Sequence, residues 1–322
     1  MEACPFQCIY CDQEKISGHS TIPSTDEISE TIQTHLSTMP DGADIEVGFF
    51  GGTFTGLGIE TQKHFLDAVQ PFIHQQRVKS IRLSTRPDFI NPENLKVLKS
   101  FHVETIELGA QSMDDEVLRR SGRGHKARAV EVASKMIHDF GFRLGLQMMV
   151  GLPGDTAEKC LFTAKKFVEL GAKDVRIYPT LIIKGTPLER FYRSGKFIPL
   201  SLDEAVNQTA MIFPVFENAG VNIIRTGLHP SEGLLDKTDL VAGPFHVSFK
   251  ELVLTKLWND QFKTIENTNN LNEIIISIPK GQLNAAVGYE AKNKKMLLRK
   301  FGKVKFVIDP TLQNRDFHVD YR

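Results

Sequence analysis

The sequence is poor in the features that mark secreted, membrane-bound and strongly nucleic-acid-binding proteins. It has only four cysteines and one tryptophan, and its 39 Lys and Arg residues are balanced by 39 Asp and Glu residues. No apolar run approaches the length that crosses a bilayer, and the first residues lack the charged-then-apolar pattern of a signal peptide. We therefore expect a cytoplasmic protein without a membrane partner, in which any nucleic-acid-binding surface is local.

The cysteines are too unevenly distributed to form a disulfide framework. Cys4, Cys8 and Cys11 fall within the first eleven residues, whereas Cys160 lies far along the chain in a segment with helical periodicity. Disulfide scaffolds are typical of short secreted domains, and a chain of 322 residues buries enough apolar surface to fold without them. The three early cysteines are therefore candidates for metal chemistry.

Short runs rich in β-branched and aromatic residues alternate with segments of helical spacing. The runs expected to be strands are Ile45–Phe50, Ser80–Thr85, Glu104–Gly109, Arg143–Val150 and Asp174–Tyr178. The segments expected to be helices are Thr25–Met39, Glu60–Gln76, Pro92–Ser100, Asp114–Phe140 and Thr156–Leu170. This alternation predicts parallel strand pairing and an α/β fold, either a barrel or a doubly wound sheet.

The pattern changes near residue 200. A long helix, Ser201–Ala219, and a strand, Val221–Arg225, precede a polar stretch that ends near Pro244. We expect a domain boundary there, with one domain over residues 1–243 and a small C-terminal α/β domain over residues 244–322.

The early cysteines have the spacing C-x3-C-x2-C, in the segment CPFQCIYC that begins at Cys4. Three thiolates can hold a [4Fe–4S] cluster and leave one iron without a protein ligand, so that an amino and carboxylate pair can chelate it. A structural zinc site is the alternative, and it would need a fourth ligand, which His19 could supply.

The same segment, with Tyr10 directly before the third cysteine, resembles the radical S-adenosylmethionine (SAM) superfamily. The resemblance implies a partial TIM-like (β/α)6 barrel and a [4Fe–4S] cluster held by Cys4, Cys8 and Cys11. It also implies that SAM binds the open iron and that Tyr10 lies near the adenine. An aromatic side chain that only packs at the rim is the alternative for Tyr10.

Paired glycines directly follow the first predicted strand. Gly51, Gly52 and Thr53 resemble the second signature of the superfamily, whose backbone holds the methionine amino group of the cofactor. Glycine suits this task because it lets the backbone approach a ligand without an intervening Cβ. A tight strand-to-helix turn would also explain the pair.

Polar residues near the carboxyl ends of the predicted strands are further candidates, because reactive groups of parallel barrels lie at that edge. Gln111 and Arg123 resemble the glutamine and arginine that oxygen-independent coproporphyrinogen oxidases use on the cofactor ribose and carboxylate. Ser84, Arg86 and Gln147 stand where those enzymes carry acidic residues, and we include Ser84 and Gln147 among the cofactor-binding candidates. A solvated helix charge is the alternative for Arg123.

One subfamily matches more closely than the others. The stretches 83–88, 106–112, 123–125 and 176–186, the last of which contains YPTLIIKGT, resemble the elongator catalytic subunit family, which modifies wobble uridines in tRNA. The resemblance runs from Cys4 to about Gly243, and the acetyltransferase domain of that family has no counterpart in this sequence. Residues 1–3 offer no first barrel strand, so we expect a truncated barrel with unpaired backbone at one edge.

The last segment is predicted to form a strand, two helices and a strand, an order that resembles a KH module. Its turn begins at Gly288, where KH domains use G-x-x-G to grip phosphates, but the second glycine is absent. Residues 280–305 carry eight basic side chains and one acidic side chain, Glu290, which gives a local charge of eight minus one, plus seven. RNA binding and a solvated, lysine-rich helix both explain this charge.

These observations leave three hypotheses for the function. The first is a radical SAM enzyme that acts on RNA, such as a tRNA base, and the second is a radical SAM enzyme that acts on a small metabolite or tetrapyrrole. Both need an external one-electron donor and yield a 5'-deoxyadenosyl radical that abstracts hydrogen. The third is a non-catalytic zinc-binding protein. The sequence indicates neither the product nor the oligomeric state.

Overall fold

The computed structural model describes residues 4, 8–18, 22–40, 42–267 and 271–322. The chain divides into two compact units, one made of residues 1–201 and 212–245 and the other of residues 202–211 and 246–322. One helix, α10 (Leu202–Asn218), contributes residues to both units. The predicted domain boundary between residues 243 and 244 therefore stays a prediction.

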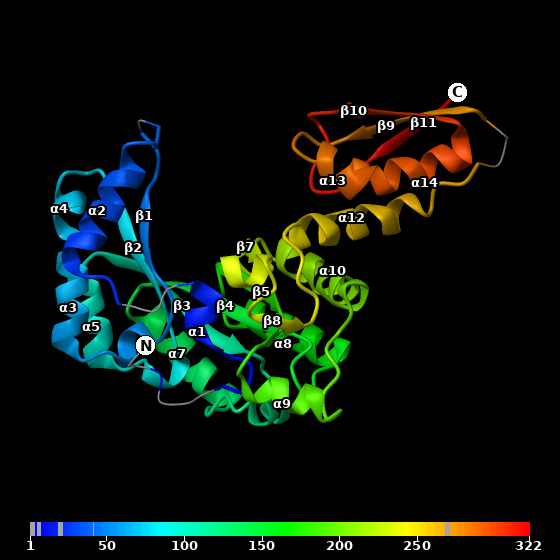
Figure 1. Ribbon diagram of the computed structural model, residues 1–322. Coiled ribbons are helices and arrows are strands. Elements are labelled where there is room, and N and C mark those ends of the chain that lie inside the picture. The colour runs from blue at the N-terminus through cyan, green and yellow to red at the C-terminus, as the bar shows by residue number, and fades with distance from the viewer. Residues whose placement is uncertain (1–3, 5–7, 19–21, 41, 268–270) are drawn as a thin grey trace. The chain divides into compact units, whose positions relative to one another are not determined.

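A parallel sheet forms the centre of the first unit. Its described strands number six, each pairs with the next along the chain, and every pairing is parallel. The strands are β1 (Glu46–Phe49), β2 (Ser80–Thr85), β3 (Val103–Gln111), β4 (Arg143–Val150), β5 (Asp174–Pro179) and β7 (Asn222–Thr226). The sheet curls into a half-barrel with helices on its outside (Figure 1), which confirms the predicted partial TIM-like barrel.

Helices and short ribbons connect these strands. The helices of this part of the chain are α1 (Gln13–Ser17), α2 (Thr25–Leu36), α3 (Ile59–Asp67), α4 (Gln70–His74), α5 (Pro92–Ser100), α6 (Asp115–Arg120), α7 (Ala127–Asp139), α8 (Ala157–Glu169), α9 (Pro187–Arg193) and α11 (Glu232–Leu235). Two 3-10 turns, η1 (Phe54–Gly56) and η2 (Pro87–Phe89), follow β1 and β2. A small antiparallel ribbon of β6 (Ile182–Ile183) and β8 (Leu240–Ala242) was not predicted.

Two segments that were predicted as single helices are each two helices. The segment 114–140 contains α6 and α7, which are separated by a loop in which Gly122 and Gly124 have φ angles of 63° and 81°. These left-handed conformations cannot continue a right-handed helix. The segment 60–76 is interrupted between α3 and α4, next to Pro71. Arg123 consequently lies in the loop between α6 and α7. The prediction that it lies on a helix is therefore wrong.

The two faces of the sheet differ in chemistry, because alternate residues of a strand point to opposite sides. Leu83, Ile106 and Ile177 belong to the face covered by helices and are fully buried. On the other face, which lines the inside of the half-barrel, Arg82 lies opposite Thr105 in the register and Glu107 lies opposite Gly145. The inside of the half-barrel is therefore polar, whereas the outer face packs as an apolar core.

The second unit is a small α/β fold, as predicted. Its elements are α12 (Phe249–Phe262), β9 (Glu273–Ile278), α13 (Leu283–Val287), the 3-10 turn η3 (Tyr289–Ala291), α14 (Lys292–Phe301), β10 (Lys303–Ile308) and β11 (His318–Tyr321). The described strands pair in the order β10-β9-β11, with β11 antiparallel to β9. Trp258, Phe262, Leu297 and Phe301 pack with the β9 isoleucines in its core. Strand β11 was not predicted.

The turn that was compared with the KH motif has an unusual backbone. Gly288, Glu290 and Ala291 have φ angles of 85°, 51° and 58°. Ala291 stands where the KH pattern has its second glycine, and it adopts the left-handed conformation that glycine favours. The comparison of this segment with a KH module therefore stays a prediction.

No described helix is long and apolar enough to cross a membrane. The predicted absence of a first barrel strand rests on residues 1–3, which lie outside the described residues.

Candidate functional site

The described part of the cysteine segment is fixed to the barrel by two backbone hydrogen bonds at Ile9. The Ile9 N–H donates to the Ser121 carbonyl at 3.1 Å, and the Ile9 carbonyl accepts from the Leu188 N–H at 2.8 Å. Ser121 belongs to the loop between α6 and α7, and Leu188 belongs to α9. Cys8 and Tyr10 are consequently held at the edge of the barrel, in an apolar cluster that includes Leu152.

The cysteine thiols differ in exposure. Cys4 is exposed, Cys8 is buried and Cys11 is partly buried. Burial, followed by the proximity of Cys8, raises the pKa of the Cys11 thiol to about 11, and the Gln13 amide donates to its Sγ at 3.4 Å. The Cys11 thiol therefore needs a positive partner to become a thiolate, which is what iron ions supply.

A preformed metal cage is not present in the described residues, where no three Cys, His, Asp or Glu side chains are gathered closely enough to hold a metal ion. The segment between Cys4 and Cys8, residues 5–7, and the proposed zinc ligand His19 both lie outside the described residues. Ligation of a cluster by Cys4, Cys8 and Cys11 therefore remains a prediction. The donor set fits an iron–sulfur cluster, because it consists of three thiols beside an arginine.

The glycine pair after β1 leaves room for a ligand. Gly51 has a φ angle of 102°, which requires glycine, and a Cβ added to Gly51 or Gly52 would have no neighbour within 4 Å among the described residues. Thr53 follows and is buried. The backbone at Gly51 and Gly52 thus borders open space at the carboxyl end of β1, as expected for a backbone that contacts a cofactor.

Three other candidates converge at the ends of β3 and β4. The Gln147 amide donates to Gln111 Oε1 at 3.2 Å. A Cβ added to Gly109 would lie 2.9 Å from Arg123 Nη2 and 3.0 Å from Gln111 Nε2, so a side chain here would displace the ends of both side chains. Gln111 itself has a φ angle of 70° at a register shift between β3 and β4. The structure therefore brings Gln111, Arg123 and Gln147 together.

Arg123 connects this group to the cysteine segment. Its Nη2 donates to the Gly109 carbonyl at 2.5 Å, and its Nη1 lies 3.5 Å from Cys8 Sγ. The side chain is buried, and its Nε has no hydrogen-bond partner among the described residues. A solvated helix charge, the alternative that the sequence left open, is therefore wrong. A buried cation with an unused donor fits an anionic group such as the carboxylate of SAM.

Arg86 and His125 complete the surroundings of Arg123, and sequence reasoning did not assign either of them a role. Arg86 is buried and forms a two-pronged pair with Asp88 at 3.0 and 2.8 Å, and its Nη2 also donates to the Arg123 carbonyl at 2.7 Å. Burial, followed by the charge of Arg123, lowers the pKa of His125 to about 4, so the imidazole is neutral near pH 7. Its buried Nε2 lacks a partner within the described part of the chain.

The two remaining candidates lie nearby in the fold. Ser84 occupies the inner face of β2, opposite Glu107 in the register. Tyr10 is buried beside Cys8, and this burial, followed by the charge of Cys8, raises the pKa of its hydroxyl. Tyr10 adjoins the group around Arg123 through Cys8, whereas Ser84 lies beside Glu107 of the next strand.

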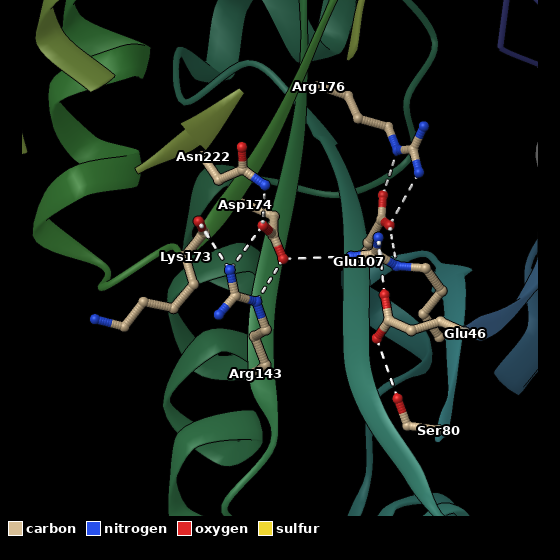
Figure 2. Close-up of polar contacts among 9 residues, drawn as sticks. Glu46, Ser80, Glu107, Arg143, Lys173, Asp174, Arg176 and Asn222 are labelled. Atoms are coloured by element: carbon tan, nitrogen blue, oxygen red, sulfur yellow. Dashed lines mark hydrogen bonds and ion pairs between the residues drawn. The ribbon is translucent and has the colours of Figure 1, made fainter. Parts of the chain in front are cut away.

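Below this edge, an ion-pair network crosses the inside of the half-barrel (Figure 2). Glu107 pairs with Arg176 on β5 at 2.5 and 3.1 Å and with Arg82 on β2 at 3.1 Å. Arg82 also pairs with Glu46 and Asp174, each at 3.3 Å. These side chains come from β1, β2, β3 and β5, so the network ties four strands together.

Asp174 and Arg176 extend the network at β4, β5 and β7. Arg143 binds Asp174 at 2.6 and 2.8 Å, and the Asn222 amide donates to the same carboxylate at 3.1 Å. The guanidinium of Arg176 stacks on the ring of Phe50, 4.6 Å from its centroid. A sequence signal for these charges existed in the alternation along each strand, but it does not reveal which charges pair.

Comparisons with known proteins agree with this geometry. The family model described as the Radical SAM superfamily matches residues 1–167, and the one described as the Radical_SAM C-terminal domain matches residues 172–259. The archaeal Elp3 of Methanocaldococcus infernus, solved with an N-terminal deletion, has a similar fold, with a TM-score of 0.60 and 24% identity over 74% of this chain and 58% of that one.

Two curated relatives are similar over shorter parts of their length. The tRNA uridine(34) acetyltransferase of Dehalococcoides mccartyi is 25% identical over 61% of this chain, which covers 50% of that protein. The heme chaperone HemW of Bacillus subtilis is 24% identical over 74% of this chain, which covers 64% of that protein. Because the first family model alone matches more than half of the sequence, the chain belongs to the radical SAM superfamily, whose members are enzymes that use a [4Fe–4S] cluster and SAM.

Proposed function

We propose that this radical SAM enzyme acts on RNA and modifies a base of tRNA. The observation that carries the radical step of the proposal is the position of Arg123, which reaches both Cys8 and the Gly109 carbonyl and so links the cysteine segment to the polar ends of β3 and β4. An arginine between these two groups suits a cofactor that is chelated to iron at one end and anionic at that same end.

Different residues of the chain would bind the cluster and SAM. Cys4, Cys8 and Cys11 would hold the cluster, and when bound, the cluster and SAM supply the one-electron cleavage that gives a 5'-deoxyadenosyl radical. The open backbone at Gly51 and Gly52 would receive the amino group of SAM. An external one-electron donor completes the proposal.

Other side chains would orient SAM. Arg123 would bind the carboxylate through its unused Nε, and Gln111, Gln147 and Ser84 would contact the ribose with uncharged donors and acceptors. Tyr10 and Thr53 would pack at the adenine and methionine ends of the cofactor, where both side chains are buried and exclude water.

Two observations support RNA as the substrate. One relative is named a tRNA uridine(34) acetyltransferase, and it is similar to 61% of this chain. In the second unit, Lys292, Lys295, Arg299, Lys303 and Lys305 are all exposed on α14 and β10. A surface of this kind favours phosphate backbones through release of counterions. The proposal concerns the radical step only, because the chain spans half of that relative's length. We propose the cytoplasm as the location of the protein, since tRNA is available there as a substrate.

The decisive experiment measures 5'-deoxyadenosine from anaerobically reconstituted protein with a chemical reductant, with and without tRNA that lacks the modification. We expect iron and sulfide in the protein and a yield of 5'-deoxyadenosine that rises with tRNA. Cys11→Ala abolishes the bound iron and sulfide and the formation of 5'-deoxyadenosine. Cys160→Ser is the control and leaves both intact, because the Cys160 thiol donates a hydrogen bond to Asp155, outside the cysteine segment. Zinc in place of iron, or a yield that does not respond to tRNA, would overturn the proposal.

A tetrapyrrole substrate is the second candidate, because the heme chaperone HemW is similar to 74% of this chain. This reading predicts that heme or a porphyrinogen, rather than tRNA, binds the reconstituted protein and changes the yield of 5'-deoxyadenosine. Titration of both ligands against the same preparation separates the two functions.

A further inference from the structure

Two arginines lie side by side on the inner face of the half-barrel. Arg176 on β5 is the register partner of Arg225 on β7, after a register shift that leaves Ile224 as an extra residue in β7. Register partners point to the same face of a sheet. Like charges at such positions repel each other, so each guanidinium needs its own compensation.

Only one of the two arginines is compensated by a carboxylate. Arg176 has both oxygens of Glu107. The network of Arg82, Arg143 and Arg176 is balanced by three acids, which are Glu46, Glu107 and Asp174. Among the described residues, Arg225 forms no ion pair with a carboxylate, and its Nη2 lies 3.4 Å from His229 Nδ1. Arg225 is therefore a partly exposed positive charge beside this network that has no carboxylate partner among the described residues.

The contact with His229 fixes the chemistry of the imidazole. A guanidinium can only donate hydrogen bonds, so Nδ1 accepts and the ring proton sits on Nε2. His229 is exposed, and its Nε2–H is a second donor next to the guanidinium. The pair therefore offers donors and presents no acceptor to a ligand.

Tyr178 adds a third donor. It occupies the inner face of β5, two residues beyond Arg176 and opposite Met149 in the register. Burial is the main influence on its hydroxyl and raises its pKa, while the charges of Arg176 and Arg225 act in the opposite direction. The hydroxyl thus keeps its proton at neutral pH and lies within the field of both arginines.

We propose that Arg225, together with His229 and Tyr178, binds a phosphate group of the substrate inside the half-barrel. β7 is an edge strand of the described sheet, and Arg225 is partly exposed, so its guanidinium is accessible to a ligand. A set of donors around an unpaired guanidinium is the arrangement that recognises phosphate oxygens. This site rests on the proposed function, because it supplies the phosphate contact beside the RNA base that reacts.

The test compares binding of uridine 5'-monophosphate and uridine to the anaerobically reconstituted holoenzyme with SAM. A charge-assisted hydrogen bond gives a preference of about tenfold or more for the monophosphate in the wild-type protein. Arg225→Gln removes this preference, and Arg225→Lys keeps part of it, because lysine keeps the charge but not the fork. Inorganic phosphate competes with the monophosphate and not with uridine.

Arg128→Gln is the matched control, because Arg128 is an exposed arginine that pairs with Glu131 on α7, and it keeps the full preference. Thermal unfolding of each variant shows that it is folded. Equal affinity for the two ligands in the wild-type protein, or a preference that survives in Arg225→Gln, overturns the site. Failure of the proposed function would appear separately, as a yield of 5'-deoxyadenosine that does not respond to tRNA.

Discussion

The ion-pair network inside the half-barrel and the carboxyl edge above it are built from the same strands and have opposite chemistry. We call the network, which consists of Glu46, Arg82, Glu107, Arg143, Asp174 and Arg176, the floor. The floor consists of charges that neutralise one another, with Glu107 between Arg82 and Arg176. The edge, at the carboxyl ends of the same strands, carries the uncharged amides of Gln111 and Gln147 and, just after β1, the glycine pair Gly51 and Gly52. A paired network is rigid and has no free donor for a ligand, whereas the edge has unused donors and room.

The difference suits a floor that holds the strands in place and an edge where we propose that the cofactor binds. Buried ion pairs seldom add much net stability, but loss of one partner leaves a charge that is expensive to bury. Four substitutions separate the two regions, and they are ordered below by the size of the expected effect.

Glu107→Gln should have the largest effect on stability. The change leaves Arg82 and Arg176 facing each other without the carboxylate that joins them, at a side chain that is only 4% exposed. We expect the free energy of unfolding to fall by about 3–5 kcal/mol. Urea denaturation of the apoprotein measures it, with Glu131→Gln in the exposed pair with Arg128 as the control, which should lose less than about 1 kcal/mol. Equal losses in both variants would show that the floor is not a structural network.

Gly145→Ala tests whether the floor is tightly packed. A Cβ at this position would lie 2.7 Å from Glu107 Cγ. We expect a loss of about 1–3 kcal/mol, because the Glu107 side chain is held by two arginines and cannot move aside cheaply. Measurement of the denaturation midpoint checks this, and an unchanged midpoint would mean that the network can shift.

Arg86→Met tests the support beneath Arg123. Arg86 touches the Arg123 carbonyl and Asp88, so we regard it as a positioning residue for the carboxylate of SAM. The KM for SAM should rise by about tenfold, equivalent to ~1.4 kcal/mol, with a smaller change in kcat. Arg86→Lys should recover part of the loss. A fall in kcat with an unchanged KM would contradict a positioning role.

Gly52→Ala should have the smallest effect and should act on the edge alone. The added methyl would meet no atom of the described part of the chain within 4 Å, so the unfolding free energy should change by less than about 0.5 kcal/mol. The same methyl should raise the KM for SAM by about threefold if the backbone contacts the cofactor there. A stability loss as large as that of Gly145→Ala would remove the distinction between edge and floor.

The sequence predicted the strands well because each is a short, strongly apolar or β-branched run. Ser80–Thr85 and Arg143–Val150 have the predicted bounds. The loop that carries Arg123 was not predicted, because the helical spacing of apolar residues continues across residues 121–126 and glycine is tolerated within such a pattern. Local periodicity thus located the elements but not their interruptions.

The contacts of the site were beyond local reasoning. Arg123 and Cys8 are 115 residues apart, and Arg176 and Glu107 are 69 residues apart. Their meeting depends on the register of parallel strands and on the bulge at Gln111, and a shift of one residue would turn each side chain to the other face. The position of polar residues near predicted strand ends, together with the resemblance to a family, named Gln111, Arg123 and Gln147 as candidates, but neither showed that they contact one another.

The left-handed backbone at Gln111 places the stability of the chain and the proposed binding of SAM in conflict. A glycine would relax this position and stabilise the chain, since a side chain there costs roughly 1 kcal/mol. It would also delete the amide that meets Gln147. Directed evolution for heat resistance alone should therefore select glycine at residue 111. The selected variants should have higher thermal stability and weaker binding of SAM.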